Sequence, residues 1–289
     1  MGDLAFSLHV AHYLELRERG EKVPRAVDGQ YPFTHVGARL HQADVLLGNL
    51  ECVVSPRGVV STDHNPFRAP LFTPRILKEN GVDLVSLANN HSADFGQAAF
   101  ADMTERLRAE GVPFLGANSY THGPESPHVV TVNGLRIGYL GFYLRSLEGA
   151  VSDAKRARAG VDILVVFNHW GRDDTKDVLP LQRRLGRALV DAGVDLVVGT
   201  HTHVLQPEEW YKGKLIFYGL GNFVFSGQNF DDAHRTGGYL EATVTAKGLV
   251  ERHFYRTQLD NTGAPHWLDN EPVEPARTAE SEPPAVQRF

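Results

Sequence analysis

Cysteine is almost absent from this sequence, because Cys52 is the only one among 289 residues. A single thiol excludes an internal disulfide and a cysteine-rich zinc site, and it fits a reducing compartment. Runs of basic residues are also absent, and 29 Lys and Arg against 35 Asp and Glu give a formal net charge of -6 at pH 7. Because nucleic-acid binding needs clustered positive charge, we expect no nucleic-acid partner.

Long hydrophobic runs are missing too. Apolar runs such as residues 161–167 are bounded within roughly eight residues, far short of the ~20 that a membrane-spanning helix needs. The first residues include Asp3 and have no basic stretch followed by an apolar one, so we expect no secretion signal. We therefore expect no membrane span in this chain and a cytoplasmic location, with an extracytoplasmic location as the alternative if residues before Met1 are missing.

The composition that remains is suited to a large folded core, with 42% hydrophobic and 22% charged residues. Short apolar runs alternate with segments of helical periodicity, which predicts an α/β protein. Buried strands are predicted over residues 44–48, 83–88, 162–167 and 195–199, and helices over residues 73–80, 97–110 and 179–192. Asn133-Gly134 predicts a hairpin turn, and a second antiparallel set is predicted over residues 214–218, 238–245 and 250–257.

The end of the chain differs in composition from the rest. From about residue 259 the sequence is rich in Pro, Glu, Ala, Thr and Ser and has little apolar content to pack. We therefore predict one domain over residues 1–258 and a disordered tail over residues 259–289.

Ligand-capable side chains follow each of the four predicted buried strands. In the open parallel sheet that the pattern favours, the carboxyl ends of neighbouring strands meet along one edge, so these side chains would converge. One carboxylate, one carboxamide and three imidazoles in such a place suit Mn, Fe or Zn. The residues concerned are Glu51, Asn90, His169, His201 and His203.

The same segments carry a resemblance to a known family. They are Gly2-Asp3, GNLE at 48–51, ANNHSADFG at 88–96, NHWG at 168–171, GTHTHVLQ at 199–206 and YGLGNFVF at 218–225. In this order they resemble the poly-γ-glutamate capsule biosynthesis family, CapA, of the calcineurin-like metallophosphoesterase superfamily. The resemblance implies a layered α-β-β-α sandwich of two mixed sheets. Since only Met1 precedes Gly2-Asp3, we expect that the first strand is absent or that the start of the chain is truncated.

The resemblance also implies a role for each matching residue. Glu51 would bridge two divalent metal ions, with Asn90, His169 and His201 completing one site and Asp3 and His203 belonging to the other. His91 would act as the general acid, and Asp94 would orient it. The superfamily has a histidine two residues after its first aspartate, whereas Leu4 and Ala5 follow Asp3 here, so one metal site is expected to be weaker.

Three further residues are candidates for contact with substrate. Arg68 could clamp an anionic group, with a solvated loop arginine as the alternative. Trp170 could line the pocket or pack in the core. Asn222 could face the metals or simply belong to a turn.

The function implied is that of a metal-dependent enzyme. The predicted reaction is a hydrolase or transferase reaction on a poly-γ-glutamate-like, peptide or phosphoester substrate, with metal-activated water and His91 as acid. One alternative is a metal-dependent peptide epimerase that exchanges a Cα proton, and another is a non-catalytic accessory subunit of capsule polymer assembly. Association with capsule or peptide biosynthesis enzymes is expected in each case.

Overall fold

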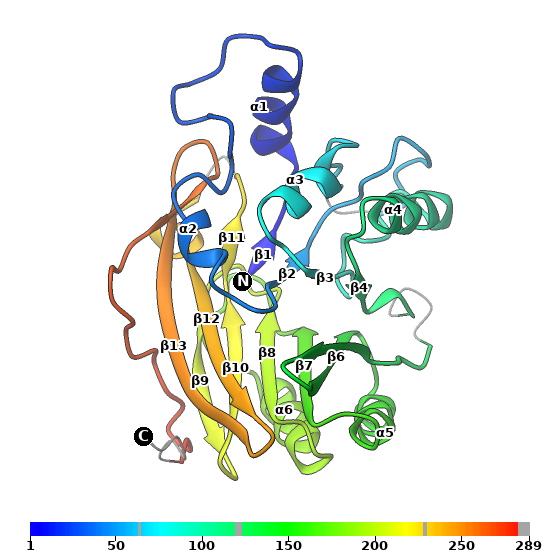
Figure 1. Ribbon diagram of the computed structural model, residues 1–289, viewed down its shortest axis with the longest axis vertical. Coiled ribbons are helices and arrows are strands. Elements are labelled where there is room, and N and C mark those ends of the chain that lie inside the picture. Colours follow the sequence, from blue (N-terminus) through cyan, green and yellow to red (C-terminus); the bar gives the residue numbers. More distant parts are fainter. Residues whose placement is uncertain (63–64, 119–122, 228–229, 283–289) are drawn as a thin grey trace.

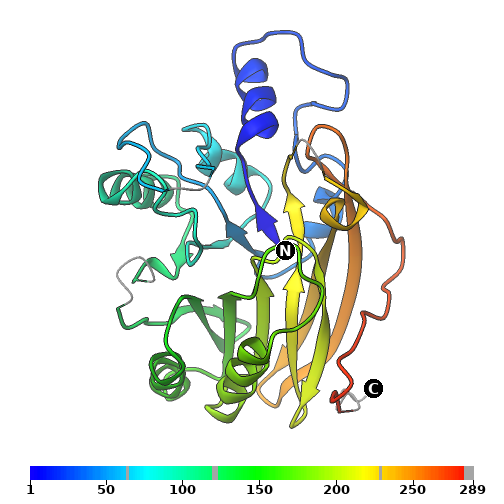
Figure 2. The same cartoon turned by 180° about the vertical axis from the view of Figure 1, so that it is seen from behind.

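The computed structural model describes residues 1–62, 65–118, 123–227 and 230–282 and contains three β-sheets (Figure 1). The five-stranded sheet has the order β11-β1-β2-β3-β4, the six-stranded sheet β5-β6-β7-β8-β10-β9, and the three-stranded sheet β12-β13-β14. Helix α1 lies at one end of the molecule, while α5 and α6 lie at the other, as both views show (Figures 1 and 2).

The five-stranded sheet holds the beginning of the chain. Its neighbouring strands all pair in parallel. They are β11 (Asn222–Val224), β1 (Asp3–Leu4), β2 (Leu47–Leu50), β3 (Leu84–Ser86) and β4 (Phe114–Leu115). The helices that connect them are α1 (Leu8–Glu18), α2 (Gly37–Leu40), α3 (Thr73–Glu79) and α4 (Gln97–Ala109).

The six-stranded sheet is mixed, because its two edge strands run antiparallel to their neighbours. Its strands are β5 (His128–Val132), β6 (Leu135–Tyr143), β7 (Ile163–His169), β8 (Leu196–Thr200), β9 (Leu205–Tyr211) and β10 (Lys214–Leu220). Helices α5 (Leu147–Arg158) and α6 (Pro180–Asp191) pack on one face, where Leu164 and Val166 of β7 contact the same apolar cluster as Leu189. Side chains of β7 are buried on both faces, which explains its continuous apolar run.

The two larger sheets pack against each other. Leu84 of β3 and Leu115 of β4 share a core cluster with Tyr139, Phe167 and Val198 of the six-stranded sheet. With α3 and α4 packed on the first sheet and α5 and α6 on the second, the layers follow the predicted α-β-β-α order. The class is therefore confirmed as α/β.

The third sheet is an antiparallel meander of β12 (Thr236–Thr245), β13 (Gly248–Leu259) and β14 (Pro265–Trp267), and the short helix α7 (Asp232–Arg235) precedes it. It packs on the six-stranded sheet through Phe254, whose ring centroid lies 4.9 Å from that of Phe217. The predicted antiparallel set at 214–257 is thus divided between two sheets, since β10 pairs with β8 and β9 instead of β12.

Three expectations need correction. The four predicted buried strands do not form one sheet, because β2 and β3 belong to the five-stranded sheet and β7 and β8 to the six-stranded one. The first strand is present, although β1 has only two residues, and it pairs with both β2 and β11. Only one of the two larger sheets is mixed, since the described strands of the five-stranded sheet are all parallel.

The predicted disordered tail also differs from the structure. Residues 259–282 include the end of β13 and the strand β14, and the rest runs along the outside of the sheets (Figures 1 and 2). The backbone N–H of Glu208 donates to Ala276 at 2.7 Å, and Thr278 donates back to Glu208 at 2.9 Å. Backbone hydrogen bonds and ion pairs hold this segment in place. The low apolar content of the sequence, from which disorder was predicted, does not report on either interaction. Residues 283–289 lie outside the described residues.

Within the part of the chain that the structure describes, the helices are too short or too polar to cross a bilayer.

Candidate metal centre

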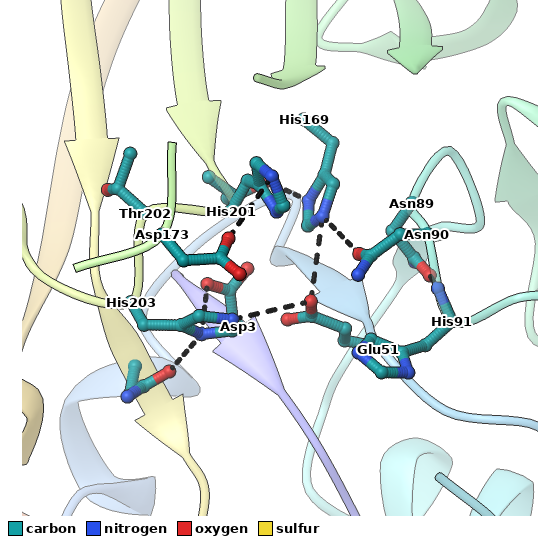
Figure 3. A network of polar contacts seen from close by, with 12 residues as sticks. Asp3, Glu51, Asn89, Asn90, His91, His169, Asp173, His201, Thr202 and His203 are labelled. Carbon is teal, nitrogen blue, oxygen red and sulfur yellow. Dashed lines mark hydrogen bonds and ion pairs between the residues drawn. The ribbon is translucent and has the colours of Figure 1, made fainter. Parts of the chain in front are cut away.

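The predicted ligands come together where strands of the two larger sheets end (Figure 3). Asp3 lies in β1, Glu51 follows β2, and His169 is the last residue of β7. His201 and His203 follow β8, and their backbone φ angles of 92° and 57° are unusual for residues other than glycine. Such a conformation costs free energy and persists where the surrounding structure holds it, which is typical of functional sites.

The first group of donor atoms contains Glu51, His169 and His201, whose donor atoms lie within 4.8 Å of one another. His169 Nε2 lies 3.5 Å from Glu51 Oε1 and 2.8 Å from Oδ1 of Asn90. Asn90 therefore adds a carboxamide oxygen to this group, as predicted from its position after β3.

A second group of donor atoms contains Asp3, Glu51 and His203, again within 4.8 Å of one another. His203 Nδ1 lies 3.7 Å from Asp3 Oδ2, and His203 Nε2 lies 3.9 Å from Glu51 Oε1. Glu51 belongs to both groups, so its carboxylate lies where a ligand bridging two ions would lie. The division of residues between the two groups is the one that the sequence resemblance implies.

The buried oxygens of these groups fit a cation. Asp3 and Glu51 are both 0% exposed, yet Asp3 Oδ2 and both carboxylate oxygens of Glu51 have no hydrogen-bond partner among the described residues. Burial raises the pKa of Glu51 well above its usual value, and the charge of Asp3 adds to the effect. A buried carboxylate without donors is costly unless it is paired or coordinates a metal. Divalent ions in this place would supply the missing partner.

Burial favours the neutral form of two of the histidines, His169 and His201. Burial lowers the pKa of His169 well below its usual value, and it lowers the pKa of His201 to about 4. Nδ1 of His201 is buried, and within the described part of the chain it has no hydrogen-bond partner. Neutral imidazole nitrogens are the form that binds Mn, Fe or Zn.

A network of amides and a hydroxyl fixes these side chains in place. Asn49 Nδ2 donates to Asp3 Oδ1 at 2.9 Å, and Asn89 Nδ2 donates to Asn49 Oδ1 at 3.0 Å. On the other sheet, Thr200 Oγ1 lies 3.0 Å from His169 Nδ1. Such outer partners orient metal ligands and set which ring nitrogen is available.

His91 lies beside this cluster (Figure 3) and is 6% exposed. Its Nδ1 lies 2.8 Å from Asp94 Oδ2, and its ring stacks on Phe67 at a centroid distance of 3.9 Å. Asp94 Oδ2 also accepts the backbone N–H of Phe67 at 2.7 Å. The predicted pairing of His91 with Asp94 is therefore observed, and the ring orientation is fixed from two sides.

Comparison with known proteins places the chain in a family. Residues 1–227 match the family described as "Bacterial capsule synthesis protein PGA_cap". The chain belongs to this family. It is 31% identical over 250 residues to the capsule biosynthesis protein CapA of Bacillus anthracis, which covers 78% of this chain and 58% of that protein. The CapA resemblance seen in the sequence is confirmed, and the chain spans little more than half of that relative's length.

This PGA_cap chain is also similar to two further proteins. A Mycobacterium tuberculosis protein described as a probable polyglutamine synthesis accessory protein is 28% identical over 260 residues, covering 78% of this chain and 67% of that protein. A solved structure of a Staphylococcus aureus protein, described as a candidate 5′-nucleotidase in complex with α-ketoglutarate, has a TM-score of 0.44 and 14% identity. It covers 82% of this chain and 46% of that one.

Three residues predicted to touch substrate in this PGA_cap chain have other contacts. Arg68 donates to the backbone carbonyls of Ser55 and Arg57 and lies 3.6 Å from the ring centroid of Phe95. Among the described residues its partners are thus loop carbonyls and an aromatic ring, and the clamp for an anionic group stays a prediction.

The other two have structural contacts as well. Trp170 is 8% exposed, belongs to the core cluster under α5 and α6, and donates from Nε1 to the carbonyl of Tyr218 at 2.9 Å. Core packing is therefore its role. Asn222 Oδ1 lies 2.9 Å from Nδ1 of His203, and its Nδ2 donates to the carbonyl of His234. Asn222 therefore faces the donor groups, as one of its two predicted alternatives stated. Its contact there is with His203, a predicted metal ligand, and not with a space open to substrate.

Asp173 and Asn49 were not predicted as part of the site. Asp173 lies four residues after His169, and its Oδ1 is 3.2 Å from His201 Nε2. With His201 and His203 it makes a third group of donor atoms within 4.8 Å. The signal was the acidic pair Asp173-Asp174, one residue beyond NHWG, and such a pair is easily taken for part of a solvated loop.

A cavity of about 960 Å³ lies elsewhere in the PGA_cap domain, between the two larger sheets and β12. Its walls are mainly apolar and include Leu47, Phe167, Val198 and Leu220. None of the predicted ligands Glu51, His169, His201 and His203 lines it, so the candidate chemistry is placed at the strand ends and not in this cavity.

Proposed function

We propose that this PGA_cap chain is a metal-dependent enzyme of the CapA type, with a dinuclear centre and hydrolase or transferase chemistry. The observation that carries the proposal is Glu51, a fully buried carboxylate that is shared by two groups of donor atoms and accepts no hydrogen bond from the residues that the structure describes. Two divalent ions held in this way would acidify water and polarise a substrate oxygen. Mn, Fe or Zn suits these nitrogen and oxygen donors.

The chain's own residues would do the rest of the chemistry. Asp94 holds Nδ1 of His91, which makes Nε2 the nitrogen that would give a proton to the leaving group. Stacking on Phe67 keeps the imidazole ring in one plane, so the proton is delivered in one direction. Asn90 and Thr200 hold His169, and Asn222 holds His203, so the cluster is preorganised before substrate arrives.

The relatives' names support a proposal for the substrate class. Those names refer to capsule, PGA and polyglutamine synthesis. We propose a poly-γ-glutamate-like, peptide or phosphoester substrate, together with association with capsule or peptide biosynthesis enzymes. The chain spans 58% of the length of the Bacillus anthracis CapA protein, so a substrate and partners for this chain are proposed and not carried over from that relative.

The substitution His91→Asn tests the proposed acid. Hydrolysis of p-nitrophenyl phosphate and of a poly-γ-glutamate oligomer is expected to fall by roughly 100-fold or more, since general acid catalysis contributes about that much. Metal content, measured by elemental analysis, is expected to stay unchanged because His91 belongs to none of the donor groups. The matched control is His12→Asn, which changes an exposed histidine of α1. Equal activity of the His91 variant and the wild type would refute the role of His91 as acid.

An accessory role is the second candidate, and it is favoured by the description of the Mycobacterium tuberculosis relative. The same variant separates the two functions. In cells whose own copy is deleted, a non-catalytic subunit would restore polymer production equally well with wild-type protein and with His91→Asn. An enzyme would restore it only with the wild type.

A further inference from the structure

The second group of donor atoms is short of ligands. Asp3, Glu51 and His203 make three donors, and Glu51 is shared with the first group. Ala5, two residues after Asp3, is buried and has no donor atom in its side chain. Zinc normally takes four ligands, and Mn or other hard ions take about six. Three protein ligands leave at least one coordination position open, which water, substrate or a further side chain can fill.

Asp173 is placed to supply such a side chain. Its carboxylate points at the cluster between His201 and His203 (Figure 3), and the three residues offer donor atoms within 4.8 Å of one another. The Asp173 side chain is 58% exposed, whereas Asp3 and Glu51 are 0% exposed. It therefore approaches the buried cluster from the solvent side.

The loop that carries Asp173 is anchored on both sides of it. Gly171 has φ +100°, and a Cβ there would lie 2.8 Å from Gln182 Nε2 and 2.9 Å from Thr202 Cγ2. Asp174 donates its backbone N–H to the carbonyl of Thr202 at 3.0 Å. Its carboxylate lies 2.7 Å from His234 Nε2. Because the backbone is fixed before and after Asp173, its side chain is directed at the cluster even though it is exposed.

We propose that Asp173 is a ligand of the second metal position, the one formed by Asp3, Glu51 and His203. This proposal rests on the dinuclear centre of the proposed function. A third carboxylate brings the charge of the acidic donors to about −3 against +4 for two divalent ions, which is closer to balance than two carboxylates. It also adds an oxygen donor, which favours Mn or Fe at this position over softer ions.

The test is a titration of the metal-free chain with Mn²⁺, followed by calorimetry and by electron paramagnetic resonance. Wild-type protein is expected to bind two ions and to give the spectrum of a spin-coupled pair. With Asp173→Ala, binding of the second ion is expected to weaken by roughly 100-fold or more, since loss of a partner that merely orients a ligand already costs about 10- to 100-fold. The spectrum should become that of an isolated Mn²⁺ ion, and the first ion should bind as in the wild type.

The matched control is Asp177→Asn, which removes an exposed carboxylate from the same loop and belongs to none of the donor groups. Two ions bound with unchanged affinity in Asp173→Ala would overturn this assignment while leaving the proposed function intact. Weaker binding of the first ion instead of the second would also overturn it, since Asp173 would then be a positioning residue for His201. Wild-type protein that takes up no Mn²⁺ would refute the dinuclear centre itself.

Discussion

Replacing Glu51 with glutamine is expected to abolish the stabilisation of this protein by divalent metal. Glu51 belongs to both groups of donor atoms, so its loss weakens both positions together. For wild-type protein, each ion should raise the free energy of unfolding by about 2.7 kcal/mol when free metal is 100 times its Kd. Activity should fall by roughly 1000-fold or more, since the metals supply several kcal/mol of transition-state stabilisation.

Without metal, the order of stability should be reversed, with Glu51→Gln more stable than the wild type. Burial and the charge of Asp3 raise the pKa of Glu51 in the folded state. The folded chain therefore binds more protons than the unfolded chain, and stability is lost as pH rises above the unfolded pKa of about 4.3. A glutamine does not ionise, so the substitution removes this loss of stability. Metal-free Glu51→Gln should therefore be more stable than metal-free wild type at pH 7. With metal added, the wild type should be the more stable protein.

Thermal and urea unfolding with and without Mn²⁺ would measure both effects. The control is Glu79→Gln, which changes an exposed glutamate at the end of α3 and should leave both curves unchanged. If Glu51→Gln retained the full metal-dependent rise in stability, Glu51 would not be the bridging ligand.

The second large effect is expected at Glu208, a buried glutamate of β9 that has cationic partners within the chain. Its Oε1 accepts from Arg252 at 2.8 Å and from Arg277 at 3.0 Å, and its side chain is 0% exposed. Substitution Glu208→Gln should destabilise the fold by about 3 kcal/mol, the lower end of the range for breaking a buried ion pair. The lower end applies because Arg252 keeps a second partner in Glu274, at 2.8 Å.

Glu274→Gln is the matched control for this prediction. The Glu274 side chain is 71% exposed, and loss of an exposed ion pair costs up to about 1 kcal/mol. Urea unfolding of the two variants measures the difference, and metal uptake should be unchanged in both. Equal stability of Glu208→Gln and wild type would mean that the ion pairs of Glu208 with Arg252 and Arg277 do not stabilise the fold, and that the backbone hydrogen bonds alone hold the segment around Arg277 to β9.

The contrast between Glu51 and Glu208 separates a site from a structural ion pair. Both are fully buried glutamates, but only Glu208 has arginines beside it, whereas Glu51 has another carboxylate, Asp3, as a neighbour. Sequence alone gives no reason to treat them differently, apart from the position of Glu51 after a strand within a recognisable motif.

Local signals in the sequence were enough to locate most elements. Gly81, Gly111 and Gly193 each have positive φ directly beyond a predicted helix, and Asn133-Gly134 forms the expected turn between β5 and β6. Helices α1 and α5 and strand β9 were not predicted. Strand β9 carries Gln206, Glu208 and Glu209 at buried positions, so its polar sequence conceals a strand stabilised by hydrogen bonds and ion pairs.

Strand ends and motif residues are local features, so the class and the family could be predicted from sequence, and so could the candidate ligands Glu51, Asn90, His169, His201 and His203. The folded chain was needed to see that these residues come from two sheets, that Trp170 packs in the core, and that Asp173 lies beside the cluster. Contacts of this kind depend on which strands become neighbours and on which surface a loop is anchored to. Both depend on packing between residues that are far apart in the sequence, and no short stretch of sequence contains that information.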